Sequence, residues 1–188
     1  PSHSYGASKL IVEKILKDHS SQNKDFSCAV LRYFNPIGVH SSYEIGENLN
    51  KSNTNLVPNI VRVLKGELKK LVVYGDDYNT HDGTGIRDYI HIDDLVSGHI
   101  SILNKMEYYK KFNIWNLGTG KGHSVLEVIR AFEKIAEIKI PYTVKKRRPG
   151  DLDCSWADVR KVNKEINWFS KKNLHDMASD VYNYYLKK

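Results

Sequence analysis

Two hydrophobic periods occur along this chain, and each predicts a different secondary structure. Between residues 5 and 19 the apolar side chains recur at three- to four-residue intervals, which predicts an amphipathic helix that Ser4 can cap. Residues 26–34 (FSCAVLRYF) form a continuous apolar run, which is typical of a strand buried in a parallel sheet. NPIG at 35–38 is expected to end that strand. The chain is then polar and aperiodic up to about residue 55, and a loop of this length indicates a functional or disordered segment.

Helical and extended patterns alternate over the rest of the chain. Asp93 and Asp94 are expected to cap one helix, and Ser124 with Glu127 forms a capping box at the start of another. Strands that alternate with helices of ordinary length indicate an α/β fold with largely parallel pairing. Helices are predicted at 55–66, 95–106, 125–137, 157–166 and 173–188, and strands at 71–75, 86–92, 112–118 and 140–146.

Ligands of parallel α/β sheets bind beyond the carboxyl ends of the strands. The loops after Phe34, Tyr74 and Gly118 therefore form the expected ligand edge. GTGKG at 118–122 resembles a phosphate cradle, but it lacks the G-x-x-x-x-G-K-[ST] spacing and runs into the capping box. A tight turn between strand and helix is the favoured interpretation of these glycines.

Polar residues near this edge suit an anionic ligand. Arg87 and Arg148 carry forked guanidinium groups that match diphosphate oxygens, although an ordinary surface pair with an aspartate is the alternative for each. Asn35 directly follows the apolar run, where its amide could donate to a phosphate oxygen or simply close a turn.

Tyr5 and Lys9 lie four residues apart in the first predicted helix, so their side chains share one face. An ammonium group near a phenol favours the phenolate, which is the form that can accept a proton. The pair is therefore a candidate proton carrier with its electrostatic partner. A surface tyrosine beside a solvated lysine is the alternative that this spacing alone leaves open.

Composition narrows the classes of function. Of 188 residues 40% are hydrophobic and 27% charged, and no apolar run reaches the ~20 residues of a membrane span. The net charge of +7 is spread along the chain rather than gathered with aromatic residues, which disfavours nucleic-acid binding. The histidines and the two cysteines show no metal-ligand spacing, and reduced thiols of a cytoplasmic protein are expected.

Several motifs occur in an order that resembles the carboxyl-terminal half of the UDP-glucose 4-epimerases, within the extended short-chain dehydrogenase family. They are PSHSYGASK, LRYFNPIGVH, NLVPNIVRV, DGTGIRDYIHIDDL, NLGTGKGHSVLEVI and RRPGDLD. The match covers nearly the whole chain. Y-x-x-x-K is shared by the wider family, whereas LRYFNP-x-G-x-H and DGTG-x-RDYIH are more particular to the 4-epimerases. Related sugar-nucleotide dehydratases and decarboxylases share the architecture.

The resemblance implies a reaction and a cofactor. UDP-glucose and UDP-galactose would be interconverted by transient oxidation at C4 with bound NAD, followed by rotation of the 4-keto sugar. Tyr5 matches the catalytic tyrosine, and Lys9 matches the lysine that holds the nicotinamide ribose and favours the phenolate. Phe34 matches a residue that lines the nicotinamide. The implied catalytic and cofactor-binding residues are thus Tyr5, Lys9 and Phe34, and no metal is implied.

The remaining matches concern the UDP-hexose. They place the diphosphate at Asn35, Arg87 and Arg148, with Asn55 and Leu56 at its phosphate end. Uracil is placed along 72–74, the ribose at Asp151 and the hexose C2 at the small wall residue Ser155. Since that wall carries a serine where some family members carry tyrosine, N-acetylated UDP-hexoses are also expected to fit. The implied substrate-binding residues are Asn35, Arg87 and Arg148, then Asn55 and Leu56, Val72, Val73 and Tyr74, Asp151 and Ser155.

The family pattern also predicts what accompanies this chain. Residues 1–54 match the last part of a Rossmann-type parallel-sheet NAD-binding domain, and residues 55–188 match a smaller α/β domain that binds the UDP-sugar, with 88–117 returning to the first. The glycine-rich dinucleotide loop and the catalytic serine or threonine of the family do not occur here, so an amino-terminal half is expected as a partner. Family members pair the Tyr5 helix with its two-fold mate, which implies a homodimer. A UDP-sugar binding module without redox activity and a basic nucleic-acid scaffold are the alternatives from other classes.

Overall fold

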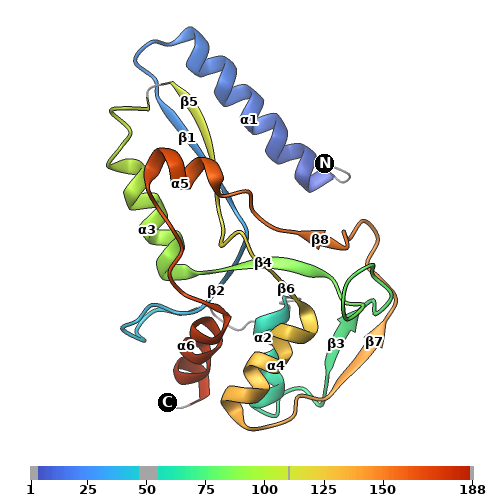
Figure 1. Cartoon of the computed structure of the whole chain (residues 1–188). Coiled ribbons are helices and arrows are strands. Elements are labelled where there is room, and N and C mark those ends of the chain that lie inside the picture. The colour runs from blue at the N-terminus through green and yellow to red at the C-terminus, as the bar shows by residue number, and fades with distance from the viewer. Residues whose placement is uncertain (1–3, 47–54, 110, 187–188) are drawn as a thin grey trace.

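The computed structural model describes residues 4–46, 55–109 and 111–186, and it has the predicted α/β architecture with parallel strands (Figure 1). Residues 47–54, which belong to the predicted long loop, lie outside this description. The helices are α1 (Ser4–Gln22), α2 (Leu56–Leu64), α3 (Ile92–Leu103), α4 (Val125–Ala136), α5 (Arg160–Ile166) and α6 (Leu174–Leu186). The strands are β1 (Cys28–Tyr33), β2 (Asn35–Ile37), β3 (Leu71–Tyr74), β4 (Ile86–His91), β5 (Phe112–Leu117), β6 (Gly122–Ser124), β7 (Tyr142–Lys145) and β8 (Cys154–Ser155).

Parallel pairing joins strands that are distant in sequence. β1 pairs with β5 over its whole length, with Cys28 opposite Phe112, and β3 pairs with β7 in the same sense. β4 is the central strand of the third group: its second half pairs with β2 in parallel, and its first half pairs with β6 antiparallel and with β8 parallel. Each β1 residue therefore reaches its partner only after a long excursion of the chain.

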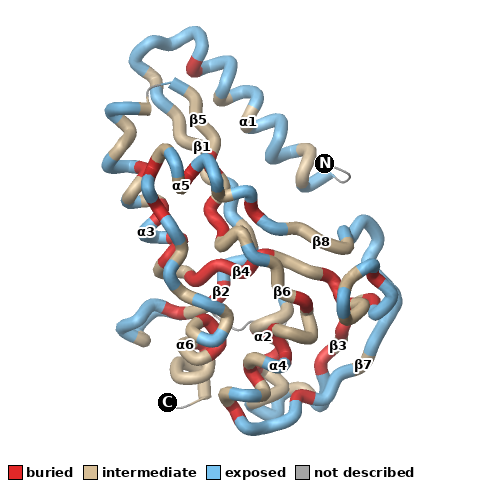
Figure 2. Tube along the Cα trace, viewed as in Figure 1, coloured by how far each residue is buried: buried red, intermediate tan, exposed pale blue. Residues whose placement is uncertain are grey.

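Two hydrophobic clusters form the interior of the described part, and their fully buried residues lie in the segments coloured red in Figure 2. The first packs α2, α4 and α6 against β3, because helix positions such as Val128, Ile129 and Phe132 recur at helical spacing and are buried. The second packs α3 and α5 against β5 around Trp115, which is 1% exposed. Val162 of α5 belongs to this second cluster, although it comes late in the chain.

The structure corrects three local predictions. The strand that starts at Cys28 is interrupted at Phe34 and then continues as β2, so NPIG contains a strand rather than ending one. α3 begins earlier than predicted: His91 is its N-cap, and the His91 ring accepts a hydrogen bond from Asp93 N at 3.0 Å. The predicted cap by Asp93 and Asp94 is therefore wrong, because the buried imidazole takes that role and both aspartates lie inside the first turn of α3. β6 separates the GTGKG turn from α4, although the Ser124–Glu127 capping box itself is confirmed.

Candidate active site

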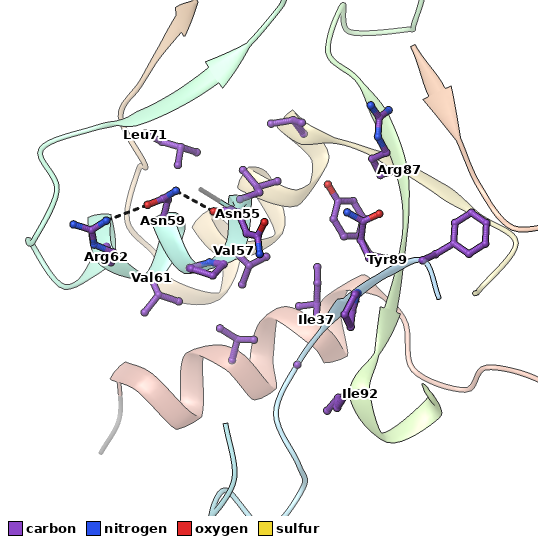
Figure 3. Close-up of a pocket in the computed structure, with 18 of the residues that line it drawn as sticks. Ile37, Asn55, Val57, Asn59, Val61, Arg62, Leu71, Arg87, Tyr89 and Ile92 are labelled. Carbon is purple, nitrogen blue, oxygen red and sulfur yellow. Dashed lines mark hydrogen bonds between the residues drawn. The ribbon is translucent and has the colours of Figure 1, made fainter. Parts of the chain in front are cut away.

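A cavity of about 1190 Å³ opens between α2, β3, β4 and the junction of β1 with β2 (Figure 3). Figure 3 shows lining residues contributed by separate elements, with Asn59 and Arg62 on α2, Leu71 at β3, and Arg87 and Tyr89 on β4. Most of the substrate residues implied by the sequence meet here, together with the implied cofactor residue Phe34. Those that line the cavity are Phe34, Asn35, Asn55, Leu56, Val72, Val73, Tyr74, Arg87, Arg148 and Asp151.

β3 presents a peptide edge to this cavity. Leu71 N and Gly75 N donate to Pro141 O and Lys145 O, each at 2.8 Å, so the odd-numbered peptide groups face β7. Successive peptide groups of a strand point to opposite sides, and the N–H and C=O groups of Val72 and Tyr74 therefore face the other edge. Within the described residues β3 pairs with β7 alone, which leaves this edge for a ligand.

Two guanidinium groups line the same cavity. Arg148 stacks over the Tyr74 ring, with 4.1 Å between the guanidinium carbon and the ring centroid. Arg87 Nη2 donates to Asp151 Oδ1 at 3.3 Å, and Arg87 Nη1 donates to its neighbour's carbonyl, Ile86 O, at 2.8 Å. The ion-pair alternative for Arg87 is thus observed, yet only 22% of its side chain and 37% of the Asp151 side chain are exposed at the cavity wall.

The amino-terminal end of α2 also borders the cavity. Asn55 is the N-cap residue in an extended conformation, and its side chain does not cap the helix. The first turn of α2 contains no acidic residue, and its N–H groups carry the positive end of the helix dipole. Leu56 and Pro58 line the cavity beside them. Such a terminus favours negative charge, which agrees in sign with the nearby arginines.

Tyr89 is a cavity residue that sequence reasoning missed. It is 5% exposed, and burial raises the pKa of its phenol to about 12, although nearby Arg87 acts in the opposite direction. Its hydroxyl therefore stays protonated near neutral pH and acts as a hydrogen-bonding group rather than a base. The signal was available, because Tyr89 lies two residues after Arg87 on a strand and so shares its face. Asn59 and Arg62 of α2 also line the cavity and were not predicted.

Tyr5 and Lys9 meet each other on α1 but do not line this cavity. Lys9 Nζ lies 5.0 Å from the centroid of the Tyr5 ring, and Tyr5 is 69% exposed. An ion pair between Glu13 and Arg32 of β1 holds the middle of α1 against the sheet, and this hydrogen bond lowers the pKa of the Glu13 carboxyl. The pair therefore lies on a fixed helix beside β1, whose carboxyl end leads into the cavity at Phe34.

Ser155 lies beside the cavity wall rather than in it. It belongs to β8 and stands opposite Arg87 in the parallel register with β4. Within the residues that the structure describes, no group of three or more histidine, cysteine, aspartate or glutamate side chains is arranged to hold a metal ion. Nor does any helix of the described part have the length and apolarity to cross a bilayer.

Comparisons with known proteins identify relatives of the chain. Residues 1–118 match the model of the NAD dependent epimerase/dehydratase family. The chain is 47% identical over 183 residues to UDP-glucose 4-epimerase of Pasteurella multocida, with 97% of this chain and 54% of that protein covered. The corresponding enzyme of Bacillus subtilis is 46% identical over 176 residues, with 94% and 52% covered. The chain thus spans about half the length of the curated relatives that it matches.

Solved structures agree with these relatives. The structure of UDP-glucose 4-epimerase from Bifidobacterium longum in complex with NAD+ and UDP has a TM-score of 0.92 at 46% identity, and the match covers 98% of this chain and 55% of that one. The UDP-Glc/GlcNAc 4-epimerase of Campylobacter jejuni has a TM-score of 0.76 at 34% identity, with 98% and 56% covered.

Proposed function

The chain belongs to the NAD dependent epimerase/dehydratase family, and on that premise we propose that it is the carboxyl-terminal half of a UDP-glucose 4-epimerase. The complete enzyme would interconvert UDP-glucose and UDP-galactose through a 4-keto intermediate. The observation that carries this proposal is the cavity, in which an open strand edge leads to two guanidinium groups and a helix amino terminus. That order of groups fits a base followed by a diphosphate.

The open edge of β3 supports uracil as the base. Uracil carries an N–H donor next to carbonyl acceptors, the same alternation that a neighbouring strand would present. The peptide groups of Val72 and Tyr74 are available for that pattern, and Val73 between them is 1% exposed and holds the strand in the core. Because these contacts use main-chain atoms, they need no particular side chain, and the types of residue in β3 do not indicate them.

The diphosphate would lie between Arg87 and Arg148, with the Asn35 amide and the α2 amino terminus at Asn55 and Leu56 as further donors. Stacking on Tyr74 already restrains the Arg148 guanidinium, which lowers the entropy lost when it binds oxygen atoms. Asp151 would then exchange its contact with Arg87 for the ribose hydroxyls.

Tyr5 and Lys9 would perform the acid–base step, and NAD, when bound, supplies the oxidation and re-reduction of the sugar at C4. Tyr5 would take the proton from the 4-hydroxyl and return it, while Lys9 stabilises the phenolate that forms. The residues fit this cofactor: an exposed phenol and ammonium suit ribose hydroxyls, and the Phe34 ring at the end of β1 suits an apolar ring face. The glycine-rich phosphate loop of such a site does not occur in this sequence.

An amino-terminal half is therefore part of the proposal. β1 pairs on one edge only within the described residues, and a two-stranded parallel sheet is too small to stand as a domain. Val96, Ile100 and Leu103 form an exposed apolar row on α3, with Leu103 70% exposed. Added parallel strands beside β1 would cover this face. In this proposal, residues 1–54 and 88–117 form the end of the nucleotide-binding domain, and 55–188 form mainly the UDP-sugar domain. We assign α5 to the nucleotide-binding domain because Val162 packs in the cluster around Trp115.

The decisive experiment follows turnover in the complete enzyme. With NAD bound, it should bind UDP and convert UDP-galactose to UDP-glucose. A second candidate function, a UDP-sugar binding module, is favoured by one observation, since the open β3 edge, Arg87 and Arg148 all lie in this sequence whereas the glycine-rich loop of the cofactor site does not. A complete protein that binds UDP and NAD but does not epimerise either sugar would favour the module.

A further inference from the structure

Asp88 is a buried acidic residue that no step of the proposed reaction uses. It is 0% exposed and follows Arg87 directly on β4. Neighbouring strand residues point to opposite faces, so Arg87 and Tyr89 face the cavity while the Asp88 carboxylate faces the back of the wall. The contacts that Asp88 makes therefore lie on the face of β4 opposite the cavity.

The carboxylate of Asp88 accepts hydrogen bonds from two segments that are far apart in sequence. Asp88 Oδ1 accepts from Thr119 N at 2.9 Å and Thr119 Oγ1 at 2.6 Å, and Oδ2 accepts from Gly120 N at 2.9 Å. Oδ2 also accepts from Ala157 N at 3.1 Å, just after β8. The N–H groups of the GTGKG turn thus surround an internal anion, which explains why this sequence resembles a phosphate cradle.

Close packing accompanies these bonds. A Cβ atom on Gly118 would lie 2.5 Å from Ala157 Cβ and 2.6 Å from Asp88 Oδ2. The turn after β5 and the end of β8 are therefore pressed against the same carboxylate, and only glycine leaves room for both.

The segment held in this way carries part of the UDP-sugar site. β8 has two residues in register with β4. On the amino-terminal side of β8, Ile86 N donates a hydrogen bond to Asp153 O at 2.8 Å. On the carboxyl-terminal side of β8, the hydrogen bond from Ala157 N to Asp88 holds the chain in place. Between the two bonds lies Ser155 opposite Arg87, and just ahead lies Asp151, which pairs with Arg87.

We propose that Asp88 is a positioning residue for UDP-sugar binding, which it serves by holding the 151–157 segment against β4. This inference rests on the proposed function, since it names a residue that shapes the same site. Asp88 touches no ligand itself. It sets the place of Arg87, Asp151 and Ser155 relative to one another, and its loss alters substrate affinity more than the acid–base step at Tyr5.

The test uses Asp88→Asn in the complete enzyme. An amide keeps one acceptor oxygen but turns an NH2 group toward N–H groups that need an acceptor. We expect KM for UDP-galactose and Kd for UDP to rise about tenfold, with kcat at saturation within about threefold of wild type. A purely structural role gives a different result, because a partly unfolded population lowers the apparent kcat and leaves KM unchanged.

Asp94→Asn is the matched control. Asp94 is also buried, at 4% exposure, and accepts backbone hydrogen bonds from Lys171 N and Lys172 N at 2.9 Å, but it holds the segment before α6 instead of β8. Its variant should lower the melting temperature and leave KM and Kd at wild-type values. If Asp88→Asn does not fold, Gly118→Ala provides the test, because its added methyl would press on both Ala157 and the Asp88 carboxylate and so disturb the same contact without removing the charge. Gly118→Ala should then show the rise in KM.

Wild-type KM and Kd in whichever of these two variants folds would overturn the inference and leave the proposed function standing. A wild-type complete protein that binds no UDP would instead overturn the proposed function, together with the site that Asp88 positions.

Discussion

Lys9 Nζ lies 5.0 Å from the centroid of the Tyr5 ring, one turn further along α1. The two side chains thus share one face of the helix, as the proposed proton carrier and its partner require. Tyr5→Phe should therefore lower kcat of the complete enzyme by about 10²–10⁴ while Kd for UDP stays constant, since Tyr5 does not line the cavity. Steady-state turnover and calorimetric UDP titration measure the two. More than about a tenth of wild-type turnover in the variant would refute the role of Tyr5.

Stacking of Arg148 on Tyr74 predicts a role for the ring in nucleotide affinity. Tyr74→Leu removes the surface that restrains the guanidinium, and an interaction of this kind contributes about 0.5–2 kcal/mol. We expect Kd for UDP to rise roughly two- to thirtyfold. Tyr74→Phe keeps the ring and serves as the control, so equal affinities of the Leu and Phe variants would contradict the prediction.

Ser155 predicts which hexoses the enzyme accepts. Its small side chain beside Arg87 should leave space for an N-acetyl group, so UDP-GlcNAc and UDP-GalNAc are expected substrates with UDP-glucose and UDP-galactose. Ser155→Tyr adds a ring beside the cavity wall at Arg87, and we expect it to cost about 1–3 kcal/mol for ligands that need the space into which the ring extends. The measurement is kcat/KM for both sugar pairs. A wild-type enzyme that ignores the N-acetylated pair, or a tyrosine variant that accepts it equally well, would show that Ser155 is not the gate.

The outer face of α1 predicts a homodimer. Ile11 and Ile15 are 56% and 61% exposed, one turn apart on the same helix. Sedimentation of the complete protein at micromolar concentration should show a dimer, and Ile11→Glu with Ile15→Glu should give a monomer because burying carboxylates in a shared apolar face is unfavourable. Ile138→Glu, at an equally exposed position after α4, is the control and should remain dimeric. A monomeric wild type would end this proposal.

The hydrogen bond from Ser124 to Asp82 should make the stability of the fold depend on pH. Burial opposes ionisation of Asp82, but hydrogen bonds from Ser124 Oγ at 2.5 Å and Thr84 Oγ1 at 2.7 Å outweigh it and lower the pKa of Asp82. A lowered pKa contributes stability that is complete above the unfolded value of ~3.9 and is lost as pH falls through the folded value.

Ser124→Ala removes this hydrogen bond and the α4 cap, and should lower the free energy of unfolding by about 1–2 kcal/mol at pH 7. The difference from wild type should shrink as pH falls below about 4 and through the lowered pKa at which folded wild-type Asp82 becomes protonated. Denaturant titrations of the complete enzyme at several pH values measure this. Ser124→Thr keeps the hydroxyl and should resemble wild type, whereas a pH-independent difference for Ser124→Ala would contradict the role of Asp82.

Long periodic elements were predictable from the sequence, and short paired ones were not. α4 and its capping box follow from helical spacing and from Ser124 and Glu127, which act within one turn of chain. β6 and β8 have three and two residues, too few to show a period, and they exist because β4 supplies partners from elsewhere. His91 caps α3 for a similar reason, since its burial depends on tertiary packing that no local pattern reports.

The candidate site divides in the same way. Spacing alone indicated Tyr5 with Lys9, and strand ends indicated Asn35 and the arginines, whereas the nucleotide residues such as Asn55 came from resemblance to a family. The open edge of β3 could not be found from residue types, because its functional groups are peptide atoms. Tyr89 could have been found from its spacing to Arg87.

The pairing of β1 with β5 leads us to expect an order of folding. The chain leaves this ladder after Tyr33 and rejoins it at Phe112, so α2, β3 and β4 all lie within the loop that the ladder closes. Closing a loop of this length costs more entropy than local contacts do, and the cost falls once the intervening segment has collapsed. The walls of the cavity should therefore become compact first, and the strand beside α1 should gain its partner late. Until then β1 stays exposed to other chains, which makes the final docking step the point at which misassembly competes with the native fold.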